Sequence, residues 1–157
     1  MFHDALVPFA ERRIIKMKYS TRLSDAVHIL VFIHQSSSST VSSSDIAVSI
    51  QTNPSYVRQI MAQLKAAGLI SSSRGQATPE LGKAPEKTSL LEIYKAVEKE
   101  KPLLHLDTHT NPECGVGVNI QLALADYYRQ IQNDVENSMR NITLQDIINS
   151  YLERISK

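Results

Sequence analysis

A short run of polar residues follows an Asn-Pro pair near the middle of the chain. Ser55, Tyr56, Arg58 and Gln59 come directly after Asn53-Pro54. Asparagine caps helices and proline is tolerated in the first turn, so the pair predicts a helix that begins with these side chains. Hydroxyl, guanidinium and amide groups bind base edges in the major groove, and first-turn amides bind phosphate. The four residues are therefore candidates for reading DNA.

A second pair of polar side chains lies between two short apolar segments. Arg74 and Gln76 belong to the turn-rich stretch 74–79, which is flanked by Leu69–Ser73 and Leu81–Lys83. Two short strands joined by such a stretch predict a β-hairpin. Side chains at its tip could reach an adjacent minor groove or its phosphates, so both residues are further candidates for DNA contact.

Cys114 is the third feature with chemistry of its own, because it is the single cysteine of the chain. One thiolate cannot hold an iron–sulfur cluster, and its spacing from His105 and His109 fits no standard metal signature, so no cofactor is expected. Three interpretations stay open. Cys114 could be a redox switch, because the start of a helix favours a thiolate. It could be an inert buried cysteine, or a small effector could bind in its loop.

The elements that must position the DNA-reading residues are three helices and a hairpin. Apolar spacing predicts helices over about 21–34, 42–50 and 54–67, with Gly68 as the left-handed residue that ends the third. One of Ser42, Ser43 and Ser44 is expected to cap the second helix. Two helices joined by a tight turn and followed by a hairpin predict a winged helix-turn-helix, which is a mainly α fold with a small β-hairpin wing.

The rear of the chain predicts further helices. Capping boxes at Ser89 and Thr143 open a helix to about Glu98 and a final helix, and a long helix runs from about Val116 to Arg140. The long helix carries an apolar stripe that the small winged domain is not expected to cover, and a second subunit would cover it. The stripe consists of Val118, Leu122, Ala125, Ile131 and Val135. An intrachain helix packed on its own core is the alternative.

The predicted organisation therefore has four parts. Residues 1–16 are an N-terminal extension and 17–100 a winged helix-turn-helix DNA-binding domain. Residues 101–115 are a sensor loop and 116–157 dimerisation helices.

Composition narrows the class of protein. The 157 residues include 42% hydrophobic and 21% charged residues with a net charge of +1, as in an ordinary globular protein. Charge is uneven, because residues 17–76 carry 5 − 2 = +3 and residues 77–157 carry 9 − 12 = −3. No apolar run is long enough to span a membrane and no secretory signal is evident, so we expect no membrane partner and a cytoplasmic location. Neither a phosphate-binding glycine loop, a nucleophile elbow nor a His-Glu-x-x-His motif is present, so an enzyme is not expected.

At these residues the sequence resembles the Rrf2 family of bacterial regulators, over about residues 17–155. The resemblance implies a homodimeric transcription factor, usually a repressor, whose long helices pair and whose wings and reading helices bind a palindromic operator on double-stranded DNA. It rests on the order and spacing of Met17–Thr21, Asp45–Ala47, Pro54–Arg58, Leu64–Ile70, Ser73–Gly75, Leu81–Lys83 and Leu90–Glu98.

The sequence departs from the family pattern at two places. Thr78-Pro79-Glu80 stands where the wing usually carries Gly-Gly-Tyr, and the loop before the long helix has one cysteine where cluster-binding relatives have three. The resemblance therefore implies a cluster-free subgroup with its own wing contacts. A protein-binding adaptor regulator that senses neither redox state nor a cluster, with a partner enzyme, is the alternative function.

Overall fold

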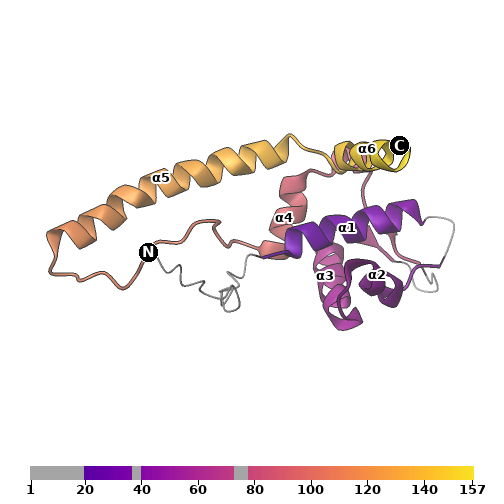
Figure 1. Ribbon diagram of the computed structural model, residues 1–157, viewed down its shortest axis with the longest axis horizontal. Helices are drawn as coiled ribbons and strands as arrows, with labels where there is room; N and C mark the ends of the chain where they lie inside the picture. The colour runs from indigo at the N-terminus through magenta and orange to yellow at the C-terminus, as the bar shows by residue number, and fades with distance from the viewer. Residues whose placement is uncertain (1–19, 37–39, 73–77) are drawn as a thin grey trace, which may run out of the picture.

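The chain is mainly helical, and the computed structural model describes residues 20–36, 40–72 and 78–157 of it (Figure 1). The expectations for residues 1–16, Arg74 and Gln76 lie outside the described residues. The predicted mainly α fold with a small two-stranded sheet is confirmed. The elements in chain order are α1 (Arg22–Gln35), α2 (Ser43–Ile50), α3 (Pro54–Ala66), β1 (Ile70–Ser71), β2 (Glu80–Leu81), the 3-10 helix η1 (Pro85–Lys87), α4 (Leu90–Glu98), α5 (Gly115–Arg140) and α6 (Leu144–Ile155).

Side-chain caps begin four of these helices at the positions that the sequence predicts. The caps are Ser42 for α2, Asn53 for α3, Ser89 for α4 and Thr143 for α6. Of the three serines expected before α2, Ser42 is the one that caps, because Asp45 then stands three residues later and completes a capping box. Hydrogen bonds from Ser42 also hold the pKa of Asp45 below its ordinary value.

The end of α3 leads directly into the wing. Gly68 takes the left-handed conformation with φ 73°, and the Leu69 amide donates to the Leu64 carbonyl at 2.9 Å, which closes a Schellman turn. Ile70 then pairs with Leu81 in an antiparallel ladder. The partner strand, expected at Leu81–Lys83, is Glu80–Leu81. Gly82 instead approaches the end of α3, where its amide donates to the Leu69 carbonyl at 3.0 Å.

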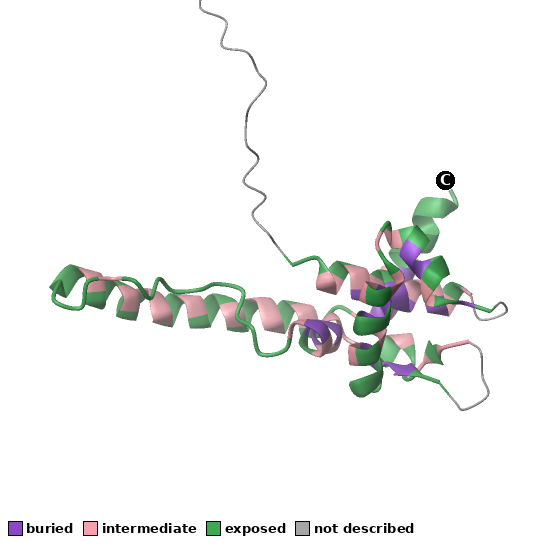
Figure 2. Ribbon diagram, turned by 90° about the horizontal axis from the view of Figure 1, so that it is seen from below, coloured by how far each residue is buried: buried purple, intermediate pink, exposed green. Residues whose placement is uncertain are grey.

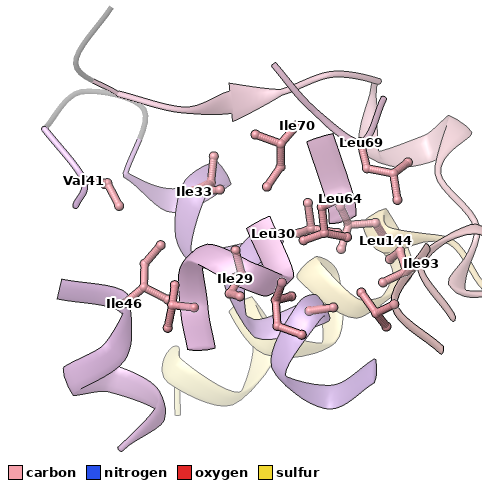
Figure 3. Close-up of a cluster of buried hydrophobic side chains, with 14 of the residues drawn as sticks. Ile29, Leu30, Ile33, Val41, Ile46, Leu64, Leu69, Ile70, Ile93 and Leu144 are labelled. Carbon is pink, nitrogen blue, oxygen red and sulfur yellow. The ribbon is translucent and has the colours of Figure 1, made fainter. Parts of the chain in front are cut away.

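A single cluster of aliphatic side chains joins α1, α2, α3, the wing, α4 and α6 (Figure 3). The fully buried members include Ile29 and Leu30 of α1, Ile46 of α2 and Leu64 of α3. Each such side chain contributes about 1.5–3 kcal/mol to folding when it leaves water. The helices are thus oriented by one shared core rather than by pairwise contacts at the surface.

The long helix α5 projects away from this core, and the chain segment before it runs back alongside the helix (Figures 1 and 2). None of the residues of α5 is buried. Although α5 has 26 residues, no helix within the described ranges is both long and apolar enough to cross a membrane.

The helix α6 returns the chain to the domain. It begins beside α4, where the Leu90 amide donates to the Ile142 carbonyl and the Leu144 amide to the Thr88 carbonyl, both at 2.8 Å. Leu144 and Ile148 are each 1% exposed within the shared core. The far end of the chain is therefore part of the same folded unit as α1–α4.

Gly82→Ala should weaken folding, because a Cβ at this position would lie 2.2 Å from the Gly68 carbonyl oxygen. We expect a loss of about 1–3 kcal/mol in the free energy of unfolding, measured by urea denaturation. Gly115→Ala is the matched control, since a Cβ at Gly115 meets no described atom within 4 Å. Equal stability of the two variants would contradict the close approach of Gly82 to the end of α3.

Candidate nucleic-acid interface

The first two turns of α3 divide into a buried face and a polar, exposed face. Val57 and Ile60 are fully buried, whereas Ser55, Arg58 and Gln59 are exposed. Within the described residues, no hydrogen bond or ion pair is formed by the Arg58 guanidinium. Three of the predicted reading residues therefore lie together on one accessible surface.

The charged side chains of α3 are all basic. No residue from Pro54 to Ala66 is acidic, and Arg58 and Lys65 are basic. Lys65 lies at the far end of α3 and donates through Nζ to Ser72 Oγ at 2.5 Å, beside the wing. A helix without acidic side chains can approach phosphates without like-charge repulsion.

Tyr56, the fourth predicted reading residue, is half-buried and turns toward α1. Its hydroxyl donates to the Asp25 carboxylate at 2.8 Å. Burial and this bond to Asp25 raise the pKa of the Tyr56 phenol. Its amide is held as well, because Asn53 Oδ1 accepts from it at 2.8 Å. While these bonds persist, the hydroxyl of Tyr56 is engaged within the protein.

Arg22 is a residue at this site that sequence reasoning counted only as a charge. Its Nε donates to the Val97 carbonyl of α4 at 3.1 Å, and a terminal nitrogen donates to Gln63 Oε1 of α3 at 2.5 Å. The guanidinium also lies 5.9 Å from the centroid of the Tyr56 ring, within the range of a cation–π contact. Arg22 thus links α1 and α4 to the first and third turns of α3.

The turn between α2 and α3 is tight and includes one strained residue. Gln51 has φ 58°, and the Thr52 amide donates to the Ala47 carbonyl at 2.9 Å. A left-handed non-glycine residue costs roughly 1–2 kcal/mol, so the packing of α2 on α3 must offset it. On the outer side of α2, Val48 is 79% exposed beside this turn.

Cys114 lies far from α3. It is exposed and stands at the start of α5, the end remote from the domain (Figure 1). The interpretation of Cys114 as a buried cysteine is therefore wrong, because the loop around it leaves its side chain open to solvent. The donor set does not fit an iron–sulfur cluster, since the parts of the chain that the structure describes contain no group of three metal-ligating side chains.

The family model and the relative that match this chain both describe transcriptional regulators. Residues 19–150 match the family model Rrf2, described as an iron-dependent transcriptional regulator. The chain is 38% identical over 130 residues to YwnA of Bacillus subtilis (strain 168), which is assigned as an HTH-type transcriptional regulator. This match covers 83% of the chain and 96% of YwnA.

Solved structures agree with this result. One, of a protein assigned to DNA binding, has a TM-score of 0.66 and 36% identity, and covers 81% of this chain and 98% of its own. CymR (YrzC), the global cysteine regulator of B. subtilis, has a TM-score of 0.62 at 20% sequence identity, and the match covers 85% of this chain and 98% of CymR. IscR of T. potens has a TM-score of 0.62 at 22% sequence identity, and the match covers 87% of this chain and 89% of IscR. The last two show the likeness of the winged-helix fold alone.

Tyr56→Phe should lower the free energy of unfolding by about 0.5–1.5 kcal/mol, because it removes the bond to Asp25. The raised pKa of Tyr56 means that this contribution is present below pH 10 and is lost as the pH rises through the folded-state pKa. The difference between the two proteins should therefore narrow in alkaline urea titrations. Tyr151→Phe, at a tyrosine of α6 that is 39% exposed, is the control. Equal effects of both substitutions at pH 7 would refute the role of the Asp25 bond.

Proposed function

This chain belongs to the Rrf2 family of transcriptional regulators, and from that premise we propose that it is a homodimeric repressor that binds a palindromic operator on double-stranded DNA in the cytoplasm. The observation that carries the proposal is the polar, exposed face at the start of α3. The proteins to which this chain is related are transcriptional regulators rather than enzymes.

In this proposal, α3 of each subunit enters the major groove. Arg58 and Gln59 read base edges, because both side chains are exposed and bring donors in geometries that match guanine and adenine. Ser55, at the start of the helix, contacts phosphate, and Tyr56 holds the angle of α3 through Asp25. Arg74 and Gln76 of the wing remain candidates for the minor groove or its phosphates.

The proposed dimer forms through α5. This helix carries large apolar side chains that the described parts of its own chain leave exposed. The exposed set comprises Val116, Val118, Ile120, Leu122, Tyr127 and Ile131. At about 100° per residue, the members at positions 116, 120, 127 and 131 share one face of α5. A two-fold arrangement covers this apolar patch on both subunits at once, which is why a second copy is the occupant we propose. At 1.5 Å per residue α5 is about 39 Å long, which is enough to hold two reading helices one DNA turn apart.

The inducing signal in this proposal is oxidation of Cys114. Its exposure makes the thiolate accessible to hydrogen peroxide, which transfers one oxygen atom to give a sulfenic acid and hydroxide. Because Cys114 lies at the remote end of α5, the change acts on how two α5 helices pair rather than on the α3 of its own subunit. No cofactor is needed for this step.

Arg58→Ala should reduce discrimination between the operator and a scrambled sequence by about 1–3 kcal/mol. The operator is obtained by selecting bound fragments from genomic DNA, and affinities are measured by fluorescence anisotropy at several salt concentrations. Arg154→Ala, on α6, removes the same charge away from the interface and should change neither affinity. Equal losses on both sequences would make Arg58 a phosphate contact, and no loss would contradict the assignment of the reading surface.

Ile120→Glu should dissociate the dimer, because it places a charge in the apolar patch of α5, where Ile120 is 49% exposed. Gln130→Glu adds the same charge on the polar side of the helix and should leave the dimer intact. Sedimentation velocity measures both masses. A monomeric wild-type protein, or an Ile120→Glu dimer of wild-type stability, would count against α5 as the interface.

Mild peroxide should lower the operator affinity of the wild-type protein, and Cys114→Ser should abolish that response while leaving affinity unchanged in reductant. The measurement is anisotropy with and without peroxide, and mass spectrometry reports the modified thiol. If peroxide lowered the operator affinity of Cys114→Ser as much as that of the wild-type protein, Cys114 would not be the redox switch, and the proposal that the protein binds DNA would be unaffected.

A further inference from the structure

A cavity of about 530 Å³ lies where α1, α4 and the start of the 101–110 segment meet. This volume is in the range of small-molecule sites, which are mostly apolar with a few polar groups. The apolar part of the lining comes from four elements of the chain and is supplied by Leu23, Tyr94, Pro102, Leu103 and Met139.

The outer wall of the cavity is held in place from two sides. The Tyr94 hydroxyl, on a side chain that is buried, donates to the Lys101 carbonyl at 2.9 Å. Two residues later, the Leu103 amide donates to Gln132 Oε1 on α5 at 2.9 Å. Hydrogen bonds therefore attach this wall to both α4 and α5, and the shape of the cavity is defined by the fold.

The charged groups of the lining favour an anion. Arg22 and Lys101 are positive, whereas Glu98 is negative and accepts a hydrogen bond from Ser20. The sum at neutral pH is +2 − 1 = +1. His105 also lines the cavity. A ligand with one carboxylate and an apolar body matches both the charge and the apolar lining.

Arg22 connects the cavity to the DNA-reading helix. Arg22 lines the cavity, and its guanidinium donates to Gln63 of α3 and lies over the ring of Tyr56. A carboxylate in the cavity competes for these donors, because carboxylates bind guanidinium groups more strongly than neutral amides do. Occupancy of the cavity and the position of α3 therefore depend on one side chain.

We propose that this cavity binds a small organic carboxylate with an apolar body, and that binding weakens operator affinity by drawing Arg22 away from α3. The regulatory half rests on the proposed function, whereas the binding half does not. The two halves are linked reciprocally, so bound operator also weakens carboxylate binding by the same factor.

Binding is tested by titrating the full-length protein with sodium octanoate and, as the neutral match, 1-octanol, using amide chemical shifts. Octanoate should shift the amide signals of the lining residues at millimolar concentration. Lys101→Ala should weaken the binding of octanoate at least fivefold without weakening the binding of octanol. Lys99→Ala removes the same charge two residues away, outside the lining, and should have no effect. Equal weakening by both variants, or shifts confined to the exposed face of α5, would overturn the site.

Regulation is tested by operator affinity with and without saturating octanoate, where we expect a loss of about tenfold. Arg22→Lys keeps the positive charge but lacks the planar guanidinium group that can donate two parallel hydrogen bonds. The variant should therefore still bind octanoate, while the octanoate-induced loss of operator affinity falls to less than threefold. An unchanged affinity with octanoate bound, or an undiminished loss in Arg22→Lys, would overturn the coupling. Failure to bind any operator without octanoate would instead refute the proposed function and leave the carboxylate site standing.

Discussion

The burial of one face of α3 determines what the opposite face presents. Val57, Ile60 and Leu64 are fully buried, and successive residues of an α-helix are about 100° apart. A rotation by one residue would therefore bring Arg58 toward the core, where an unpaired charge is costly. The cap at Asn53 and the Schellman turn at Gly68 fix the two ends of the same helix. Chemistry at the DNA surface is thus set by aliphatic packing behind it.

The same core reaches the far end of the chain. Because α6 places Leu144 and Ile148 in the shared core and the Ile142 carbonyl accepts from the Leu90 amide of α4, the projecting helix α5 joins the domain at a packed junction rather than at a linker. The Lys95–Glu136 ion pair, with 3.1 Å between Nζ and Oε2, adds a further contact between α4 and α5. The end of α5 nearest the domain is therefore in direct contact with α4, which itself packs on α3.

Local signals in the sequence were enough to predict most of the fold. Asn53-Pro54, Gly68 and the capping boxes at Ser89 and Thr143 each depend on residues a few positions apart, and the structure places helix ends at these residues. The Ser42 cap was one of three open choices, although the spacing to Asp45 distinguishes it.

Contacts between distant residues could not be predicted in this way. The Asp25–Tyr56 bond spans 31 positions and the Arg22–Gln63 bond spans 41, and no periodicity or turn signal encodes such pairs. The cavity beside Arg22 depends on the same kind of contact, since Gln132 holds its wall from 29 positions away. The second strand ends at Leu81 rather than at Lys83 for a similar reason, because Gly82 approaches Gly68, which is 14 positions away.

The base of the wing is held by the Ile70–Leu81 pairing, by the approach of Gly82 to Gly68 and by side chains of the two strands that pack in the shared core. Such contacts depend little on the side chains between the two strands. The residues that join the strands can therefore be exchanged without loss of the fold. Within a genome that encodes several paralogous regulators, replacement of the wing tip offers a route to new target sites that leaves the reading helix and its core untouched.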